Sequence, residues 1–238
     1  MAYIKTPTLF KYLINFPEDH IPDKNYPLVV GLHGAGSNPE NLITIWDQIP
    51  NSNFIYAAPQ APFPLVVDTK LVFDWAMWPS GDVDLINRAT EISEKYIVDV
   101  VQDISNSNNI GEVYLMGFSQ GAIFTYLVGL KQHHLFKGII CFSGPGLLAP
   151  LVNPFIGSSG PNWLTEEEIQ NADKLRVFIT HGKEDQNPKY ELGIRSRDIL
   201  IKHGHDVTFR DFVGGHTIPT DPILGEIVDW IKTPHQKE

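Results

Sequence analysis

Short apolar runs alternate with stretches of helical periodicity along most of this chain, and no other feature limits its fold as much. From about residue 27 onward, each run has the length of a strand, and apolar residues between the runs recur at roughly helical spacing. The runs are residues 28–32, 53–58, 112–116, 138–142, 175–180 and 207–212. Their nearly continuous apolar character is typical of strands that are covered on both faces. We therefore predict an α/β fold, with a mostly parallel central sheet and helices on both faces.

The helices and one additional strand are expected in the remaining segments. Residues 9–16 are expected to pair at an antiparallel edge of the sheet. Asn38 and Pro39 have the pattern of a helix cap followed by proline at the first helical position, which predicts a helix over residues 41–48. Further helices are predicted over residues 84–104, 122–130, 188–203 and 222–231. Because we find no repeat and no linker, we expect one α/β domain over residues 1–238.

Two long connections, residues 59–80 and 143–172, carry many large apolar side chains. Long loops in compact domains are usually functional or disordered, and so many apolar groups argue against disorder. These loops either pack as satellite core or line an acyl or aromatic substrate pocket above the sheet. The candidate pocket residues are Phe63, Phe73, Trp75, Trp78, Leu148, Phe155 and Trp163.

The composition narrows the range of partners. The formal net charge is −10 and no block of Lys or Arg occurs, which disfavours nucleic acid or an anionic membrane. The single cysteine, Cys141, excludes an intramolecular disulfide, and its apolar surroundings predict a buried core residue. No apolar stretch approaches membrane-spanning length, and the N-terminus lacks the pattern of a signal peptide. We expect a cytoplasmic protein, and the sequence leaves monomer and homodimer open.

A pentapeptide between a strand and a helix carries the strongest chemical signal. Gly117-Phe118-Ser119-Gln120-Gly121 directly follows an apolar run and directly precedes a helical stretch. In this setting, G-x-S-x-G indicates a sharp turn that exposes a nucleophilic serine, with glycines where side chains would be crowded. The amide of Gln120 is then expected to point, at the positive end of the helix, to the place where a substrate oxyanion forms.

Two further turns supply the partners that a serine nucleophile needs. The run 175–180 leads to Asp185, and the run 207–212 leads to His216 on a glycine-rich turn. The chain order is therefore serine, acid, histidine, as in α/β hydrolases. We expect His216 to take the proton of Ser119 and later to return one to the leaving group, while Asp185 fixes the imidazole tautomer.

Other titratable residues are expected to have different roles. Glu184 is the alternative acid, but its longer side chain on the neighbouring position is expected to point elsewhere. His181 is expected to shape the turn that presents Asp185. Six histidines are expected on the surface: His20, His133, His134, His203, His205 and His235. No metal site is predicted, because no histidine pair has the three or four convergent ligands that a metal needs.

The loop after the first parallel strand is expected to supply a second oxyanion donor. Leu32-His33-Gly34-Ala35-Gly36-Ser37 follows the run 28–32, and its glycines let the backbone approach a substrate closely. The amide of Ala35 is our candidate donor beside that of Gln120. A nucleotide site is disfavoured, because the sequence contains neither G-x-G-x-x-G nor G-x-x-x-x-G-K-[ST].

Together, these motifs resemble the phospholipase/carboxylesterase family of α/β hydrolases, which contains acyl-protein thioesterases and small bacterial carboxylesterases. The matching motifs are L-H-G at 32–34, P-x-A-P at 59–62, G-F-S-Q-G at 117–121, H-G-x-x-D at 181–185 and G-H at 215–216. The resemblance implies an α/β-hydrolase fold and cofactor-free hydrolysis of carboxylic esters or thioesters through an acyl-serine intermediate. Ser119, Asp185 and His216 would form the triad, and the amides of Ala35 and Gln120 the oxyanion hole.

Departures from the family pattern bear on the substrate. Ala35-Gly36-Ser37 stands where thioesterase members have L-G-D, Pro188 follows Asp185 one residue sooner than usual, and the loop 143–172 is longer. We therefore expect a serine carboxylesterase that acts on small-molecule esters of small or medium acyl chains. The alternatives are an acyl thioesterase, a feruloyl or acetyl esterase or a peptidase on the same scaffold, and a non-catalytic binding protein.

Overall fold

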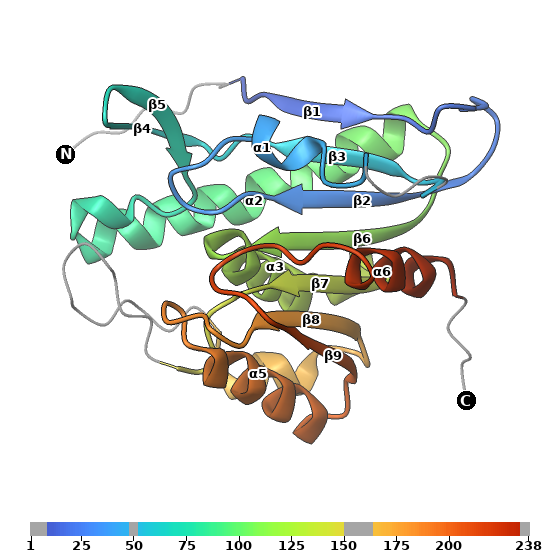
Figure 1. Ribbon diagram of the computed structural model, residues 1–238. Coiled ribbons are helices and arrows are strands. Elements are labelled where there is room, and N and C mark those ends of the chain that lie inside the picture. Colours follow the sequence, from blue (N-terminus) through green and yellow to red (C-terminus); the bar gives the residue numbers. More distant parts are fainter. Residues whose placement is uncertain (1–8, 48–51, 150–163, 234–238) are drawn as a thin grey trace.

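The computed structural model of the protein describes residues 9–47, 52–149 and 164–233. A seven-stranded sheet lies at its centre, in the order β1-β3-β2-β6-β7-β8-β9 (Figure 1). These strands are β1 (Tyr12–Asn15), β2 (Tyr26–Leu32), β3 (Ile55–Pro59), β6 (Ile110–Phe118), β7 (Gly138–Phe142), β8 (Arg176–Gly182) and β9 (Asp206–Phe212). The edge strand β1 pairs antiparallel with β3, and every other neighbouring pair is parallel. The predicted mostly parallel sheet with an antiparallel edge is therefore confirmed.

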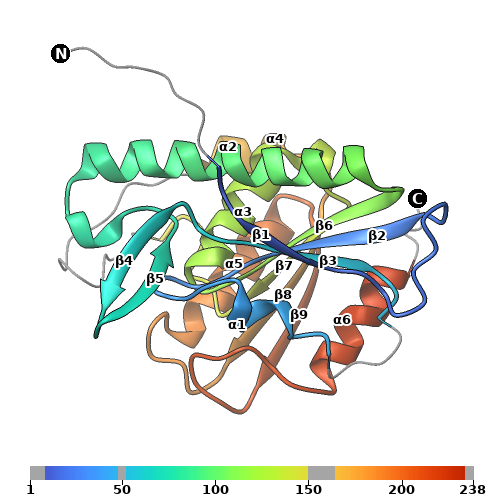
Figure 2. The ribbon, with the colours of Figure 1, turned by 90° about the horizontal axis from the view of Figure 1, so that it is seen from above.

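Helices cover both faces of the sheet (Figure 2). On one face lie α2 (Val83–Ser107), α3 (Gln120–Lys131), α4 (Glu166–Asn171) and α5 (Tyr190–Lys202); on the other lie α1 (Glu40–Ile43) and α6 (Ile223–Lys232). Successive side chains of a strand point to opposite faces, so Leu28 and Val30 pack on the α2 side while Val29 packs on the α6 side. This double cover explains why the strands are apolar almost throughout.

The five predicted helices are all present. Most of their ends differ from the prediction by one to three residues, and helix α1 is much shorter than predicted. Helix α1 ends at Ile43, and residues 44–47 form turns in place of the continuing helix predicted to residue 48. Three β-branched residues in succession, Ile43, Thr44 and Ile45, disfavour helix there. Helix α2 begins one residue early, because Asp82 caps it by accepting a hydrogen bond from the amide of Leu85 at 3.1 Å.

The connection 59–80, predicted as a loop, contains a β-hairpin. Its strands β4 (Phe63–Val67) and β5 (Lys70–Asp74) pair antiparallel, and a short 3-10 helix, η1 (Trp78–Ser80), follows. Asp68 and Thr69 form the turn with φ of 47° and 68°. The hairpin exposes the side chains of Val66, Val67 and Leu71. The connection 143–172 contains the short helix α4, and a second 3-10 helix, η2 (His133–Leu135), follows α3.

The parallel strands all end at the same edge of the sheet. Leu32 lies beside Gly117 in the register of β2 and β6, Phe118 beside Phe142, and Gly182 beside Phe212. The loops that leave these ends therefore converge. In open α/β sheets, the carboxyl edge is where ligands bind.

Candidate active site

Ser119 lies on a tight turn between β6 and α3, with φ of 57° and ψ of −117°. The turn brings backbone segments so close that the flanking positions have no room for a side chain. A Cβ on Gly117 would collide with the carbonyl oxygen of Gly121, and a Cβ on Gly121 would collide with the carbonyl oxygen of Leu32. This crowding is the physical reason for the G-x-S-x-G spacing, and it leaves the Ser119 side chain half-buried at the carboxyl edge of the sheet.

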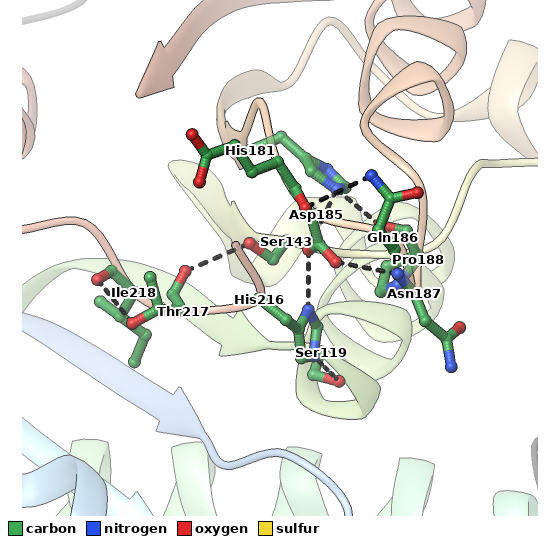
Figure 3. A network of polar contacts seen from close by, with 11 residues as sticks. Ser119, Ser143, His181, Asp185, Gln186, Asn187, Pro188, His216, Thr217 and Ile218 are labelled. Carbon is green, nitrogen blue, oxygen red and sulfur yellow. Dashed lines mark hydrogen bonds and ion pairs between the residues drawn. The ribbon is translucent and has the colours of Figure 1, made fainter. Parts of the chain in front are cut away.

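A chain of hydrogen bonds joins Ser119, His216 and Asp185 (Figure 3). His216 Nε2 lies 2.8 Å from Ser119 Oγ, and His216 Nδ1 lies 2.8 Å from Asp185 Oδ2. A carboxylate can only accept a hydrogen bond, so Nδ1 of His216 carries the ring proton. In the neutral ring, Nε2 is then unprotonated and able to accept the Ser119 hydroxyl proton. The structure thus brings together the three side chains that the sequence predicted to interact.

The alternative acid, Glu184, does not join this chain. Its side chain is exposed, whereas that of Asp185 is fully buried. Asp185 is also oriented from its other oxygen, because Oδ1 accepts a hydrogen bond from the amide of Asn187 at 3.0 Å. The carboxylate that faces His216 is therefore held in one orientation.

His181 supports the same turn. Its ring is fully buried, and Nε2 lies 3.0 Å from the carbonyl oxygen of Pro188 and 3.4 Å from Asp185 Oδ2. Burial lowers the pKa of His181, so a neutral ring with its proton on Nε2 donates to Pro188 and sits beside the carboxylate. The expectation that His181 shapes the turn that presents Asp185 agrees with these contacts.

The acid turn and the histidine turn are packed backbone against backbone. The amide of Lys183 donates to the carbonyl of Phe212 at 2.9 Å, and the amide of Glu184 donates to that of Gly214 at 2.9 Å. Ser143, at the end of β7, adds a third connection, because its Oγ donates to the carbonyl of Thr217 at 3.2 Å. The position of His216 is thus fixed from two neighbouring strands.

The loop between β2 and α1 runs beside the serine. A Cβ on Gly34 would lie 3.4 Å from the Cβ of Ser119, and Ala35 is exposed next to it. His33 holds the start of this loop: Nδ1–H donates to the Gly34 carbonyl at 2.8 Å, and Nε2 accepts from the amide of Ala61 at 3.1 Å. These bonds require a neutral ring, and burial lowers the pKa of His33 to about 4.

The side chain of Gln120 ties the hairpin β4–β5 to the serine turn. Its Oε1 accepts from the amide of Trp75 at 3.1 Å, and its Nε2 donates to Asp74 Oδ2 at 3.0 Å. Asp74 is fully buried, and its Oδ1 accepts from the amide of Ala76 at 2.8 Å. Burial raises the pKa of Asp74, and the bonds from Gln120 and the backbone lower it only in part.

The prediction that Trp75 lines a substrate pocket is wrong. Its side chain has no exposed surface, because the indole packs between His33 and Phe124 and donates from Nε1 to the carbonyl of His33 at 2.9 Å. Trp75 is a core residue that joins the hairpin to the β2–α1 loop.

The other predicted pocket residues that the structure describes are half-buried, and Phe73, Trp78 and Leu148 pack against the same core cluster. Phe63 and Phe73 are half-buried on the hairpin, Trp78 is half-buried in η1, and Leu148 is half-buried beyond β7. Phe155 and Trp163 lie outside the described residues. A cavity of about 240 Å³ does adjoin His216, but none of these residues lines it. Its lining is His33, Gly34, Ser37, Asn41, Leu42, Phe118, His216, Thr217 and Ile218.

Predictions for residues away from the serine had mixed outcomes. His205 is buried and not on the surface: Nδ1 accepts from the amide of Leu175 at 3.2 Å, and Nε2 donates to the carbonyl of Ile169 at 3.1 Å. Cys141 is buried, as predicted. Within the described ranges, His, Cys, Asp and Glu side chains form no group of three that could hold a metal ion. No helix among those residues is long and apolar enough to cross a membrane.

Asp74, Ser143 and Asn41 are site residues that sequence reasoning missed. Ser143 directly follows an apolar strand, which is the same signal that identified Asp185 and His216. The other two carry no such signal. Asp74 ends a strand that was predicted as loop, and Asn41 reaches the site only through the bend of the β2–α1 loop.

Solved esterase structures share this fold. A phospholipase/carboxylesterase from Dyadobacter fermentans has 19% identity and a TM-score of 0.66, covering 96% of this chain and 99% of that one. A CE1 ferulic acid esterase from Anaeromyces mucronatus, solved with ferulic acid, has 16% identity and a TM-score of 0.69, covering 97% and 91%. The protein therefore has the α/β-hydrolase fold.

The sequence comparisons narrow the class further. The profile of the phospholipase/carboxylesterase family matches residues 20–233, and the chain belongs to this family. Acyl-protein thioesterase 1 from Gibberella zeae is 30% identical over 169 residues, which are 67% of each chain. The chain spans about half the length of two further curated relatives. Its family and its neighbours make the protein a hydrolase of the esterase type.

Proposed function

We propose that the protein is a serine carboxylesterase in which Ser119 is the nucleophile, His216 the general base and acid, and Asp185 the residue that orients His216. His216 takes the Ser119 proton as Oγ attacks the ester carbonyl carbon, and then gives a proton to the leaving alcohol. Water, deprotonated at the same ring, then attacks the acyl-serine and releases the carboxylic acid. The buried Asp185 carboxylate stabilises the imidazolium in both half-reactions.

The oxyanion hole is part of this proposal. The amides of Gln120, at the start of α3, and of Ala35, on the exposed loop beside Ser119, are the assigned donors. Two features support this assignment. The positive end of the α3 dipole lies at Gln120, and the loop runs so close to the serine that a Cβ on Gly34 would lie 3.4 Å from the Cβ of Ser119.

The single observation that carries the proposal is the hydrogen-bond chain with two distances of 2.8 Å from Ser119 Oγ through His216 to a fully buried carboxylate. The chain has the geometry that a general base needs to remove the serine proton.

Replacement of the nucleophile tests the proposal. We expect Ser119→Ala to fold with wild-type circular dichroism and to lose nearly all hydrolysis of p-nitrophenyl butyrate, together with labelling by a fluorophosphonate probe. Ser107→Ala, at an exposed serine near the end of α2, is the matched control and keeps both activities. Turnover retained by folded Ser119→Ala would exclude Ser119 as nucleophile. A folded wild type that neither reacts with the probe nor hydrolyses esters would instead be a non-catalytic binding protein.

Thioester hydrolysis is the second candidate function, because the chain is 30% identical to acyl-protein thioesterase 1 from Gibberella zeae. We expect esters of small or medium acyl chains to be preferred. The two functions are separated by measuring rates on p-nitrophenyl esters of rising chain length, a feruloyl ester and matched acyl thioesters. A thioester preferred over an ester of equal chain length would make thioester hydrolysis the first candidate.

The cytoplasmic location and the single-domain organisation stay predictions.

A further inference from the structure

The cavity of about 240 Å³ beside His216 is lined by none of the aromatic residues that the sequence predicted for a pocket. Its lining includes Gly34, where a Cβ would lie 3.4 Å from the Cβ of Ser119, and His216 with Thr217 and Ile218. The cavity thus borders His216, whose Nε2 lies 2.8 Å from Ser119 Oγ. At about 30 Å³ for each water-sized group, it holds roughly eight non-hydrogen atoms.

The position of this cavity points to one part of the substrate. His216 Nε2 must lie next to the leaving oxygen, because it hands its proton to that atom. A group in a cavity walled by the His216 ring is therefore attached to the leaving oxygen. The acyl chain, on the other substituent of the same carbon, extends away from this cavity.

The lining of the cavity combines an apolar floor with a polar rim. Leu42, Phe118 and Ile218 supply the apolar part. On the rim, Asn41 Nδ2 donates to Ser37 Oγ at 3.1 Å, so the Ser37 hydroxyl proton and Asn41 Oδ1 remain available to a ligand. Ser37 and Asn41 therefore offer one donor and one acceptor, which is the pair that a second hydroxyl group on the ligand can satisfy.

We propose that this cavity is the leaving-group subsite and that it selects a small hydroxylated alcohol, held by Ser37 and Asn41, so that the preferred substrates are monoesters of short polyols. This inference rests on the proposed esterase function and specifies its substrate class. An alkyl alcohol of equal size fills the same space but leaves the rim groups without partners, which lowers its transition-state binding.

Two butyrate esters whose alcohols have equal numbers of non-hydrogen atoms test the proposal: glycerol monobutyrate and pentyl butyrate. We expect wild-type kcat/KM to favour the glycerol ester by about tenfold. Asn41→Leu, a variant of similar side-chain size, should bring this ratio close to one, and Ser37→Ala should lower it in the same direction. Asn106→Leu, at an exposed position on α2, is the matched control and should keep the wild-type ratio.

Each contrary result has a distinct meaning. Equal kcat/KM for the two esters in the wild type, or a ratio that Asn41→Leu and Ser37→Ala leave unchanged, overturns the subsite. If Asn41→Leu instead alters the preference between methyl butyrate and methyl 3-hydroxybutyrate, the cavity holds the acyl group and the proposal is wrong. If the folded wild type hydrolyses no ester and does not react with a fluorophosphonate, the esterase function itself fails.

Discussion

Ser119 has backbone angles that residues with side chains rarely adopt, and the cost of such a conformation is of order 1–3 kcal/mol. The surrounding contacts hold it there. Its amide donates to the carbonyl of Phe142 at 3.0 Å, and its carbonyl accepts from the first turn of α3. The glycines at 117 and 121 remove the collisions that any Cβ would cause.

The tight turn between β6 and α3 should therefore not accommodate alanine at position 121. A Cβ there meets the backbone carbonyl oxygen of Leu32, which cannot move without displacing β2. We expect Gly121→Ala to lower the free energy of unfolding by about 1–3 kcal/mol or more and to reduce activity, as measured by urea denaturation and ester hydrolysis. Gly111→Ala is the control, because its Cβ would meet nothing closer than 3.7 Å. Equal stability of the two variants would contradict this account.

The choice between two adjacent acids gives a second prediction at this scale. Asp185→Asn keeps the shape of the side chain but removes the charge that orients and stabilises His216, so kcat should fall by about 10²–10⁴-fold. Glu184→Gln changes an exposed carboxylate on the same turn and should stay within twofold of wild type. Steady-state kinetics of both variants decide, and the reverse ranking would transfer the role to Glu184.

At the scale of elements, the hairpin β4–β5 depends on a few buried polar contacts near its base. Gln120 connects Asp74 and Trp75 to the start of α3, and Ser93 Oγ on α2 donates to the carbonyl of Trp75 at 2.6 Å. The backbone of Phe73 bridges to Ser37 on the β2–α1 loop. The hairpin is thus joined to both segments proposed to hold the oxyanion donors.

Loss of the Gln120 side-chain amide should loosen this junction. Gln120→Met has similar size, but it leaves the buried Asp74 carboxylate without one donor and the Trp75 amide without its acceptor. We expect about 1–3 kcal/mol of destabilisation in urea unfolding, with lower kcat/KM. Gln102→Met, at an exposed position on α2, controls for the substitution. A fully stable, fully active Gln120→Met would show that these bonds do not hold the hairpin.

The sequence predicted the elements that repeat a strong pattern and missed those that depend on distant contacts. Each parallel strand was found within about two residues, because double burial makes the strands apolar throughout. The hairpin was missed because its turn, Asp68-Thr69, adopts positive φ without the usual Asn-Gly or Asp-Gly signal.

The same distinction applies to the site. Ser119, Asp185 and His216 each follow a strand closely, so their convergence was predictable from local position. Trp75 was assigned to a pocket because sequence cannot reveal a hydrogen bond to His33, 42 positions away. The cavity beside His216 escaped prediction for a similar reason, since its walls come from three separate stretches of chain.

At the scale of the whole molecule, buried histidines couple the fold to pH. Burial lowers the pKa of His33, His181 and His205, so the folded protein keeps these rings neutral where the unfolded chain protonates them. The stability that they contribute is fully present above the unfolded pKa of about 6.5 and is lost as pH falls through their folded values. Asp74, whose pKa is raised, acts in the opposite direction.

We therefore expect the wild type to become easier to unfold between about pH 6.5 and pH 4, with His33 alone contributing about 3 kcal/mol. Urea unfolding across this range measures the slope. His33→Gln should flatten it, while His134→Gln, at an exposed histidine, should not. A slope unaffected by His33→Gln would show that this ring does not stay neutral in the folded protein.

Backbone hydrogen bonds join the turn that carries Asp185 to the turn that carries His216. The exposed side chains of these turns are therefore not needed to hold the two turns together. Val213 is 83% exposed between β9 and His216, and Cys141 is the single cysteine of the chain and is buried. A cysteine introduced at position 213 would thus be a unique attachment point three residues from His216. A fluorophore coupled there would follow the turn through each catalytic cycle, and a surface linker would immobilise the enzyme in one orientation.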